Sequence, residues 1–134
     1  MSSIERVTSP DVAEAPPGHW SNLLVVDKVA YFSGLTARAK DQTTIEGRDE
    51  YEQTKVIFGK FQSLITAAGG TMADMVQLTI FVTNIKNREG VWKARREFFR
   101  GDFPACALVE VASLASSEVL VEIQGIAHLG AGKK

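Results

Sequence analysis

The middle of the chain places a strand-like segment between two helix-like segments, and this order restricts the possible folds more than any other feature of the sequence. Over residues 76–82, apolar side chains occupy every second position, which is the pattern of a strand with one apolar face. Residues 49–68 carry apolar side chains at a spacing of about 3.6 residues, and Gly69-Gly70 then supplies a helix stop. Residues 88–100 predict a second helix. We therefore expect an α+β fold in which two helices pack on a sheet.

The remaining strands lie on either side of this central region. Residues 22–26 and 29–33 are short β-rich runs with the spacing of a hairpin. Residues 37–48 are polar and predict an exposed loop, and residues 104–111 and 119–129 predict two further strands. The predicted order is β-β-α-β-α-β-β, with both helices on one face of the sheet.

The other face of the predicted sheet is also apolar, because we expect it to carry Phe81, Leu108, Leu120 and Ile126. No helix remains to cover these side chains, and a patch of this kind is too apolar to stay exposed. Either the sheet curls on itself or it packs against other copies of the chain. The second solution is the more economical, so we expect an oligomer.

The length of 134 residues fits a single domain. We expect this domain to span residues 1–134, with flexible segments at 1–15 and 130–134. The first 18 residues contain acids and prolines but no apolar core segment, so they do not resemble a signal peptide. No apolar run approaches the roughly 18 residues that span a bilayer. We expect a cytoplasmic location and no membrane partner.

Charge and ligand content argue against several functional classes. The chain has 15 basic and 16 acidic residues and a net charge of −1, so electrostatics give no reason to expect nucleic acid as a partner. Its two histidines and one cysteine lack the short spacing of a zinc site. The chain has no glycine-rich phosphate loop followed by a helix. We therefore expect neither a metal nor an organic cofactor, and the single cysteine fits a reducing compartment.

Two glutamates interrupt strands that are otherwise strongly apolar, and a glutamate is seldom fully buried without a partner. For Glu110, a position at a rim or on a solvated stripe is the simpler explanation. For Glu122, the flanking run VLVEIQGIA is apolar on both faces, so a solvated position is harder to defend. We therefore single out Glu122 as the candidate functional carboxylate.

Four further residues have both a structural and a functional explanation. Cys106 shares a strand face with Glu110, but a cysteine in an apolar strand is most often a small core residue with an inert thiol. No histidine lies near it in the sequence to lower the pKa of the thiol. Trp20 and Trp92 could line a pocket, although packing is the commoner role. Arg38 is a loop cation that gains significance only if the substrate is an anion.

Several motifs together resemble the RidA/YjgF family. They are VAYFSG, ITAAGGTMADMVQLTIFVTNI, the REFF-x-x-DFPA turn, and VEVASL followed by VEIQGIA. The resemblance covers residues 9–128, with helices and strands in the same order. It implies a chorismate-mutase-like α+β fold and a homotrimer whose sheets close into a central barrel. It also implies active sites in the clefts between subunits.

Characterised members of this family hydrolyse enamines and imines to ketones or aldehydes and release ammonia. The resemblance implies that Glu122 positions or activates water, and that Gly18-His19-Trp20 replaces a tyrosine-bearing loop. In relatives, an arginine after the FPA turn binds the substrate carboxylate, and here that position is Cys106. A thiol cannot form a two-pronged ion pair with a carboxylate. We expect Cys106 to act as a small polar wall or proton relay.

The stretch SGLTARAKDQTTIEG is similar to the 2-aminomuconate deaminases of aromatic-compound degradation, a branch of the family without the arginine. Their substrate is an extended dicarboxylate enamine, which would need other cationic anchors, and Arg38 is the first candidate. The resemblance also places further residues at the substrate cleft: His19, Trp20, Ser33, Gly34, Trp92, Ala105 and Glu110. The alternative is a non-catalytic trimer that binds a small metabolite or a partner protein in the same cleft. Loss of the arginine favours this alternative, whereas Glu122 favours the deaminase.

Overall fold

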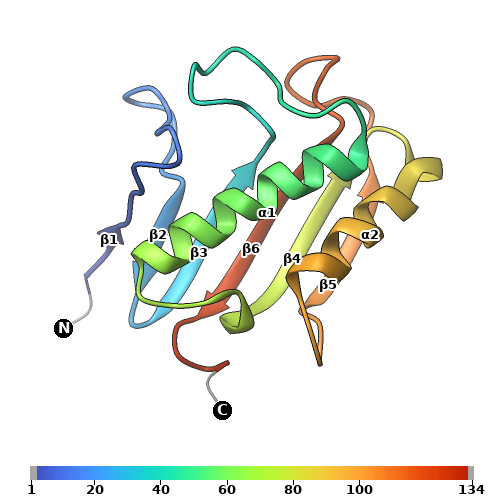
Figure 1. Cartoon of the computed structure of the whole chain (residues 1–134). Helices are drawn as coiled ribbons and strands as arrows, with labels where there is room; N and C mark the ends of the chain where they lie inside the picture. Colours follow the sequence, from blue (N-terminus) through green and yellow to red (C-terminus); the bar gives the residue numbers. More distant parts are fainter. Residues whose placement is uncertain (1–2, 133–134) are drawn as a thin grey trace.

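The structure is a computed structural model that describes residues 3–132. It contains one mixed six-stranded sheet with two α-helices on one of its faces (Figure 1). In chain order the elements are β1 (Glu5–Arg6), β2 (Leu23–Val26), β3 (Val29–Leu35), α1 (Glu50–Ala67), the 3-10 helix η1 (Met72–Asp74), β4 (Met75–Val82), the 3-10 helix η2 (Ile85–Asn87), α2 (Arg88–Phe98), β5 (Ala105–Glu110) and β6 (Val121–His128). The predicted fold class and element order are confirmed, and β1 is an unpredicted addition.

The strand order across the sheet is β1-β2-β3-β6-β4-β5. All neighbouring strands are antiparallel except β4 and β5, and α2 makes the crossover that this parallel pair needs. The last strand of the chain, β6, therefore lies between β3 and β4 (Figure 1). A residue on β6 is flanked by strands from both halves of the chain. Within residues 3–132, no helix has the length and apolar character needed to cross a membrane.

Helix α1 begins and ends where the sequence predicts. Asp49 caps its start, because Oδ1 of Asp49 accepts a hydrogen bond of 2.8 Å from the N–H of Glu52. The helix stops before Gly69, whose φ of 89° is a conformation that favours glycine. Phe61 is fully buried against the sheet and stacks on Phe32, with ring centroids 4.5 Å apart. The predicted apolar face is therefore the face that packs on the sheet.

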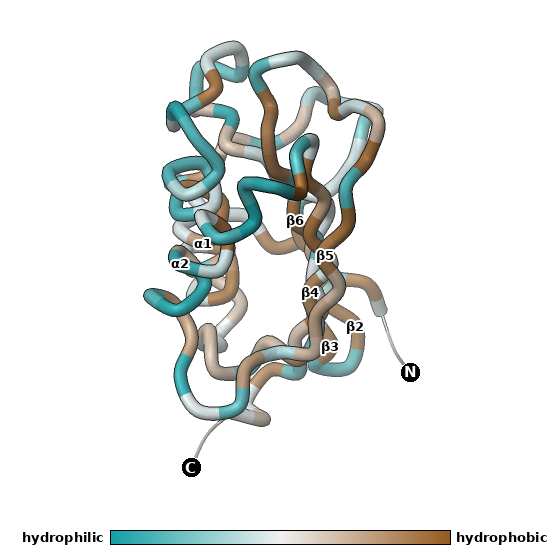
Figure 2. The backbone as a smooth tube through the Cα atoms, turned by 90° about the vertical axis from the view of Figure 1, so that its right-hand side faces the viewer, coloured by the Kyte–Doolittle hydropathy of each residue, from teal (hydrophilic) through white to brown (hydrophobic). Residues whose placement is uncertain are grey.

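The sheet face away from the helices is uncovered in the protomer (Figure 2). Tyr31 and Val109 are 48% and 42% exposed. Phe81 and Ile126 alternate along their strands with fully buried neighbours and are themselves half-buried. This face therefore carries apolar side chains that the protomer alone does not cover.

The prediction that Leu108 belongs to this uncovered face is wrong, because its side chain packs against the core on the helix side. Leu120, just before β6, is half-buried and also contacts the core. Leu108 lies opposite the buried Ile80 in the parallel ladder, so both side chains point toward the helices. β5 is an edge strand with apolar residues at both alternating positions, so the sequence does not show which set faces inward.

Near both ends of the described chain, residues that the sequence predicted to be flexible make specific contacts. β1 pairs with β2, and Val12 is buried in the core. At the other end, the carboxylate of Asp74 accepts hydrogen bonds from the N–H groups of Gly130 and Gly132. Residues 1–2 and 133–134, part of the same prediction, lie outside the described residues. The pairing of β1 and the burial of Val12 thus attach the N-terminal segment to β2 and to the core.

Gln53, a buried residue of α1, holds the loop before α1 and the loop before β6 through hydrogen bonds. Its Nε2 donates hydrogen bonds to the carbonyl oxygens of Glu118 and Gly47, at 2.9 and 3.2 Å. Its Oε1 accepts a hydrogen bond of 2.9 Å from the N–H of Leu120. The amide is therefore fully used in the core, and it fixes the loop that leads into β6.

Candidate active site

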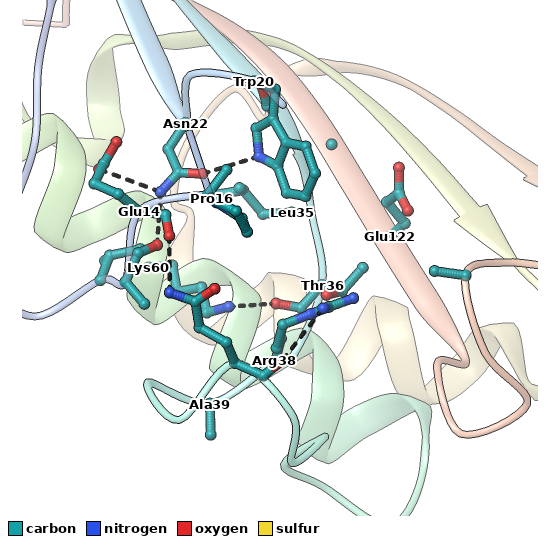
Figure 3. Close-up of a pocket in the computed structure, with 17 residues that line it drawn as sticks. Glu14, Pro16, Trp20, Asn22, Leu35, Thr36, Arg38, Ala39, Lys60 and Glu122 are labelled. Atoms are coloured by element: carbon teal, nitrogen blue, oxygen red, sulfur yellow. Dashed lines mark hydrogen bonds between the residues drawn. The ribbon is translucent and has the colours of Figure 1, made fainter. Parts of the chain in front are cut away.

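A cavity of about 420 Å³ lies at the C-terminal end of β3 (Figure 3). Its walls come from the N-terminal segment, the loop after β3, α1, the loop before β6 and β6 itself. The lining includes five residues that sequence analysis proposed for the site: Trp20, Ser33, Gly34, Arg38 and Glu122. The structure therefore brings together residues that are up to about a hundred positions apart in the chain, as expected for a site at the end of a sheet.

Glu122 is a half-buried residue of β6 whose carboxyl reaches this cavity. Among residues 3–132, no hydrogen bond or ion pair satisfies this carboxyl group. Burial raises its pKa above the ordinary value for glutamate. A carboxyl group in this situation can hold or release a proton nearer to neutral pH than an exposed glutamate can.

The strand beside Glu122 is irregular, which makes room for its side chain. The β3–β6 register shifts between Phe32 and Leu35, and Ser33 and Gly34 lie within this interruption. A Cβ atom at position 34 would collide with Oε2 of Glu122, so glycine allows the carboxyl to lie against the backbone. The hydroxyl of Ser33 donates a hydrogen bond to a carbonyl oxygen of the N-terminal loop. The predicted Ser-Gly pair thus shapes the site through the backbone.

Lys60 of α1 also lines the cavity, and sequence analysis missed it. Its Nζ donates a hydrogen bond of 2.7 Å to the carbonyl oxygen of Thr36. Burial lowers the pKa of this amine to about 8. The sequence did contain a signal, because Lys60 follows Ile57 by three positions and precedes Leu64 by four, which places a lysine on the buried stripe of the helix.

Arg38 provides a second cation at the same cavity. Its Nη1 donates a hydrogen bond of 3.3 Å to the carbonyl oxygen of Gln42, and within residues 3–132 it has no carboxylate partner. Glu14 also lines the cavity, but its carboxylate already forms an ion pair of 2.7 Å with Arg6. The cavity therefore offers a ligand two cations that are not neutralised by this acid.

The aromatic residues of the N-terminal loop lie differently from one another. Trp20 lines the cavity, is 47% exposed and donates a hydrogen bond of 3.2 Å from Nε1 to Oδ1 of Asn22 (Figure 3). His19 is exposed and lies edge-on to Trp20, with ring centroids 5.9 Å apart, but is not part of the lining. Trp20 can thus contact a ligand from one protomer alone, whereas His19 lies at the margin.

The other predicted site residues lie on β5 and α2, away from this cavity: Trp92, Ala105, Cys106 and Glu110. We refer to this region as the β5 edge. Cys106 pairs in register with the buried Leu78 and so shares the helix side of the sheet, whereas Glu122 points to the opposite side. Within one protomer, the predicted residues therefore form two separate groups.

Cys106 and Glu110 each have a partner at the β5 edge. Nη1 of Arg95 donates a hydrogen bond to Sγ of Cys106 at 3.2 Å. Oε1 of Glu110 accepts a hydrogen bond of 3.0 Å from the N–H of Ile85, at the start of η2. Glu110 therefore has a structural contact, and the part it plays in binding stays a prediction.

Metal ligands are not gathered anywhere in the described chain. Among residues 3–132, no group of three histidine, cysteine, aspartate or glutamate side chains is placed to hold a metal ion. The groups available for chemistry at the cavity are a carboxyl, an amine and a guanidinium. These groups can bind anions and transfer protons.

The fold and the site define a small α+β protein that presents an isolated acid and two cations in a cavity at the end of an interrupted strand. A family model described as Endoribonuclease L-PSP matches residues 11–129. The chain belongs to this family, which is the RidA/YjgF family, and the resemblance seen in the sequence is confirmed. The family is known for deamination of enamines and imines, for homotrimers and for binding small metabolites.

Solved structures agree with this assignment. A protein of unknown function from Pseudomonas aeruginosa is 35% identical, with a TM-score of 0.85 over 97% of this chain and 95% of that chain. A protein of the conserved Rid family from Yersinia pestis is 29% identical, with a TM-score of 0.85 over 95% of this chain and 100% of that chain. RidA from an Antarctic Psychrobacter is 23% identical and shares the fold, with a TM-score of 0.83 over 93% and 99% of the two chains.

Proposed function

We propose that this protein is a metal-free hydrolytic deaminase that converts an enamine or imine metabolite to a carbonyl compound and ammonia. The observation that supports this most is Glu122, a half-buried carboxyl at a cavity of small-metabolite size, with no hydrogen-bond partner among residues 3–132. Its raised pKa suits a group that both accepts and donates protons closer to neutral pH than an exposed glutamate does. A structural glutamate would instead be paired, as Glu110 is with the N–H of Ile85.

The proposed reaction begins when the enamine carbon takes a proton from solvent, which gives the protonated imine. Glu122 then accepts a proton from water while the water oxygen bonds to the imine carbon, and a tetrahedral carbinolamine forms. Return of this proton to the amine nitrogen lets the C–N bond break, so that ammonia leaves as the C=O bond forms and the hydroxyl proton passes to solvent, which replaces the proton taken up in the first step. The net reaction consumes one water and releases one ammonia, so the balance requires no oxidant or reductant.

We propose that the active assembly is a homotrimer in which the β5 edge of one protomer lies against the cavity of the next. Two observations support this arrangement. The predicted site residues form two separate groups in the protomer, and the sheet face away from the helices leaves apolar side chains such as Tyr31 and Val109 exposed. Contact between protomers would cover this face and join the two groups.

We propose that the substrate carries at least one carboxylate and that Arg38 and Lys60 bind one. Both cations line the cavity, and neither has an ion pair within residues 3–132. An extended dicarboxylate enamine such as 2-aminomuconate, an intermediate of aromatic-compound degradation, fits this charge pattern. Small 2-imino monocarboxylates are the simpler alternative substrates within the same reaction class.

Ammonia release tests the proposal directly. The purified protein is mixed with a panel of enamines and imines, including 2-aminomuconate and imines generated from amino acids by an amino-acid oxidase. We expect release of ammonia faster than in buffer alone for at least one carboxylate-bearing compound, and a slower rate with Glu122→Gln. If no compound reacts faster while carboxylates still bind, the chain is a non-catalytic binding protein and the proposed activity is wrong.

A further inference from the structure

Lys60 of α1 lies at the boundary between two cavities. Besides the cavity of about 420 Å³ that Glu122 lines, the described chain has a smaller cavity of about 180 Å³. Five residues line both cavities: Val12, Ala13, Arg38, Ala39 and Lys60. Among these five, Lys60 alone carries a side-chain group that can act as a nucleophile, its amine. The amine therefore borders a space large enough for a small metabolite.

The amine of Lys60 has few partners. Nζ donates a hydrogen bond of 2.7 Å to the carbonyl oxygen of Thr36 (Figure 3), and within residues 3–132 it forms no ion pair. Glu46, at the smaller cavity, attracts its charge from beyond ion-pair distance, and Arg38 repels it. An ammonium has three protons to donate, so one carbonyl oxygen leaves most of this capacity unused. These contacts favour the charged form less than a carboxylate partner would.

The other charged groups of the two cavities leave this amine unpaired. At the larger cavity, Glu14 already forms an ion pair on the N-terminal segment, and the pKa of Glu122 is itself raised by burial. At the smaller cavity, Asp11 and Lys40 complete the charged lining, and neither is ion-paired within residues 3–132. No acid of either cavity therefore neutralises Lys60 directly.

Burial lowers the pKa of the Lys60 amine to about 8. About a quarter of this amine is then neutral at pH 7.5, against about one part in a thousand for an exposed lysine. Lys55, on the same helix, differs in both respects. Its Nζ lies 4.5 Å from the centroid of the Tyr51 ring, and interaction with Tyr51 raises its pKa. The chain therefore contains a reactive lysine and an internal reference on one helix.

We propose that Lys60 is a covalent binding site for small 2-oxo acids, with which it forms a reversible Schiff base. Arg38 lines the same two cavities and has no carboxylate partner within residues 3–132, so it can bind the carboxylate of the acid whose carbonyl carbon Lys60 attacks. The inference rests on the proposed function in that such carbonyl compounds are products of the deaminase. A product held on Lys60 occupies the cavity, so the adduct inhibits turnover.

The reaction requires no oxidant or reductant. Nζ of the neutral amine bonds to the carbonyl carbon, and the carbonyl oxygen takes one proton from Nζ and one from solvent. This oxygen then leaves as water while the C=N bond forms. The product is a protonated Schiff base that keeps one N–H, which can still donate to the carbonyl oxygen of Thr36. The contact seen in the structure therefore suits the adduct as well as the free amine.

The test uses glyoxylate, the smallest 2-oxo acid, on the full chain in its native assembly. Cyanoborohydride reduces any Schiff base to a stable secondary amine, and mass spectrometry of the peptides locates it. At pH 7.5 we expect Lys60 to be modified at least about tenfold faster than Lys55. The preference should shrink above pH 8, where Lys60 gains little more neutral amine and Lys55 still does. Equal modification of the two lysines at pH 7.5 overturns the proposal, and this measurement needs no variant that has to fold.

Uncharged glycolaldehyde is the matched probe for the carboxylate. Lys60 should react with glyoxylate at least about fivefold faster than with glycolaldehyde, and Arg38→Met should remove this difference. The control Arg48→Met removes an exposed guanidinium that is paired with Glu52 and should preserve it. Equal rates of the two probes in the wild type overturn the assigned ligand class.

Failure of this inference is distinguishable from failure of the proposed function, because the labelling does not depend on turnover. Selective modification of Lys60 without ammonia release from any imine refutes the deaminase and leaves the covalent site. Ammonia release from an imine, with Lys60 modified no faster than Lys55, refutes the covalent site and leaves the deaminase.

Discussion

Replacement of Glu122 by glutamine tests the assigned chemistry most sharply, because it removes an acid and keeps its size. The carboxyl has no hydrogen-bond partner among residues 3–132, so the fold loses no contact when it is neutralised. If Glu122 transfers protons in the reaction, kcat should fall by about a hundredfold or more, the usual contribution of a general base. A hundredfold loss corresponds to about 2.7 kcal/mol of transition-state stabilisation.

The stability of the same variant has a predictable sign. The folded-state pKa of Glu122 is raised by burial, so the charged form disfavours folding. This penalty is absent below the unfolded pKa, grows between the unfolded and folded pKa values, and is constant at higher pH. At neutral pH, Glu122→Gln should therefore melt at the same temperature as the wild type or slightly higher. The difference should shrink when the comparison is repeated in acid, where the wild-type carboxyl is protonated.

The assay measures kcat and melting temperature on one preparation of each protein. Glu118→Gln is the matched control, because it neutralises an exposed glutamate in the loop just before β6. It should change neither quantity. A Glu122→Gln protein that melts early but turns over normally would refute the catalytic role, since the carboxyl would then be a structural group. Normal stability with normal kcat would also refute it.

Three further predictions concern the cavity and the assembly. Gly34→Ala should lower kcat at least about tenfold by displacing the Glu122 carboxyl. The control Gly59→Ala should leave kcat unchanged, because no atom lies within 4 Å of the new Cβ. Equal activity of the two variants would contradict the geometry. Carboxylate binding should weaken as the pH rises through about 8, where Lys60 loses its proton. Lys60→Met should remove this pH dependence. If the pH dependence of binding is the same in the variant, a group other than Lys60 causes it. Light scattering should give three times the chain mass of 14.6 kDa, and a stable monomer would exclude the proposed trimer.

The helices were predictable from sequence because their signals are local. Asp49 and Gly69 mark the ends of α1, and the 3.6-residue pattern shows which face is buried. The inward position of Arg95 was also open to prediction, since it follows the buried Val91 by four positions. The sequence could not show that its guanidinium meets Cys106, because that contact depends on how β5 lies beneath α2.

The side of β5 that faces the helices and the set of residues that line the cavity were not predictable for a related reason. On β5 both alternating faces are apolar, so Leu108 was assigned to the wrong side, and only its pairing with Ile80 settles the matter. Trp20, Ser33 and Gly34 entered the candidate site through the family resemblance, and no local pattern marks them. Lys60 had a local signal in its position on the apolar stripe of α1. Its hydrogen-bond partner, the carbonyl oxygen of Thr36, lies in a loop distant in sequence and has no such signal.

The interior position of β6 has a consequence for how the chain is made. Until the ribosome has released residues 121–128, β3 and β4 have no partner between them, and each presents an open edge of unpaired backbone groups. The nascent chain can form its helices early, but the two halves of the sheet stay unjoined until synthesis is almost complete. The strand that closes the sheet is also the strand that carries Glu122. The chain therefore acquires its structural integrity and its candidate catalytic group in the same late event, and a translation product that stops short of β6 is an aggregation hazard as well as an inactive protein.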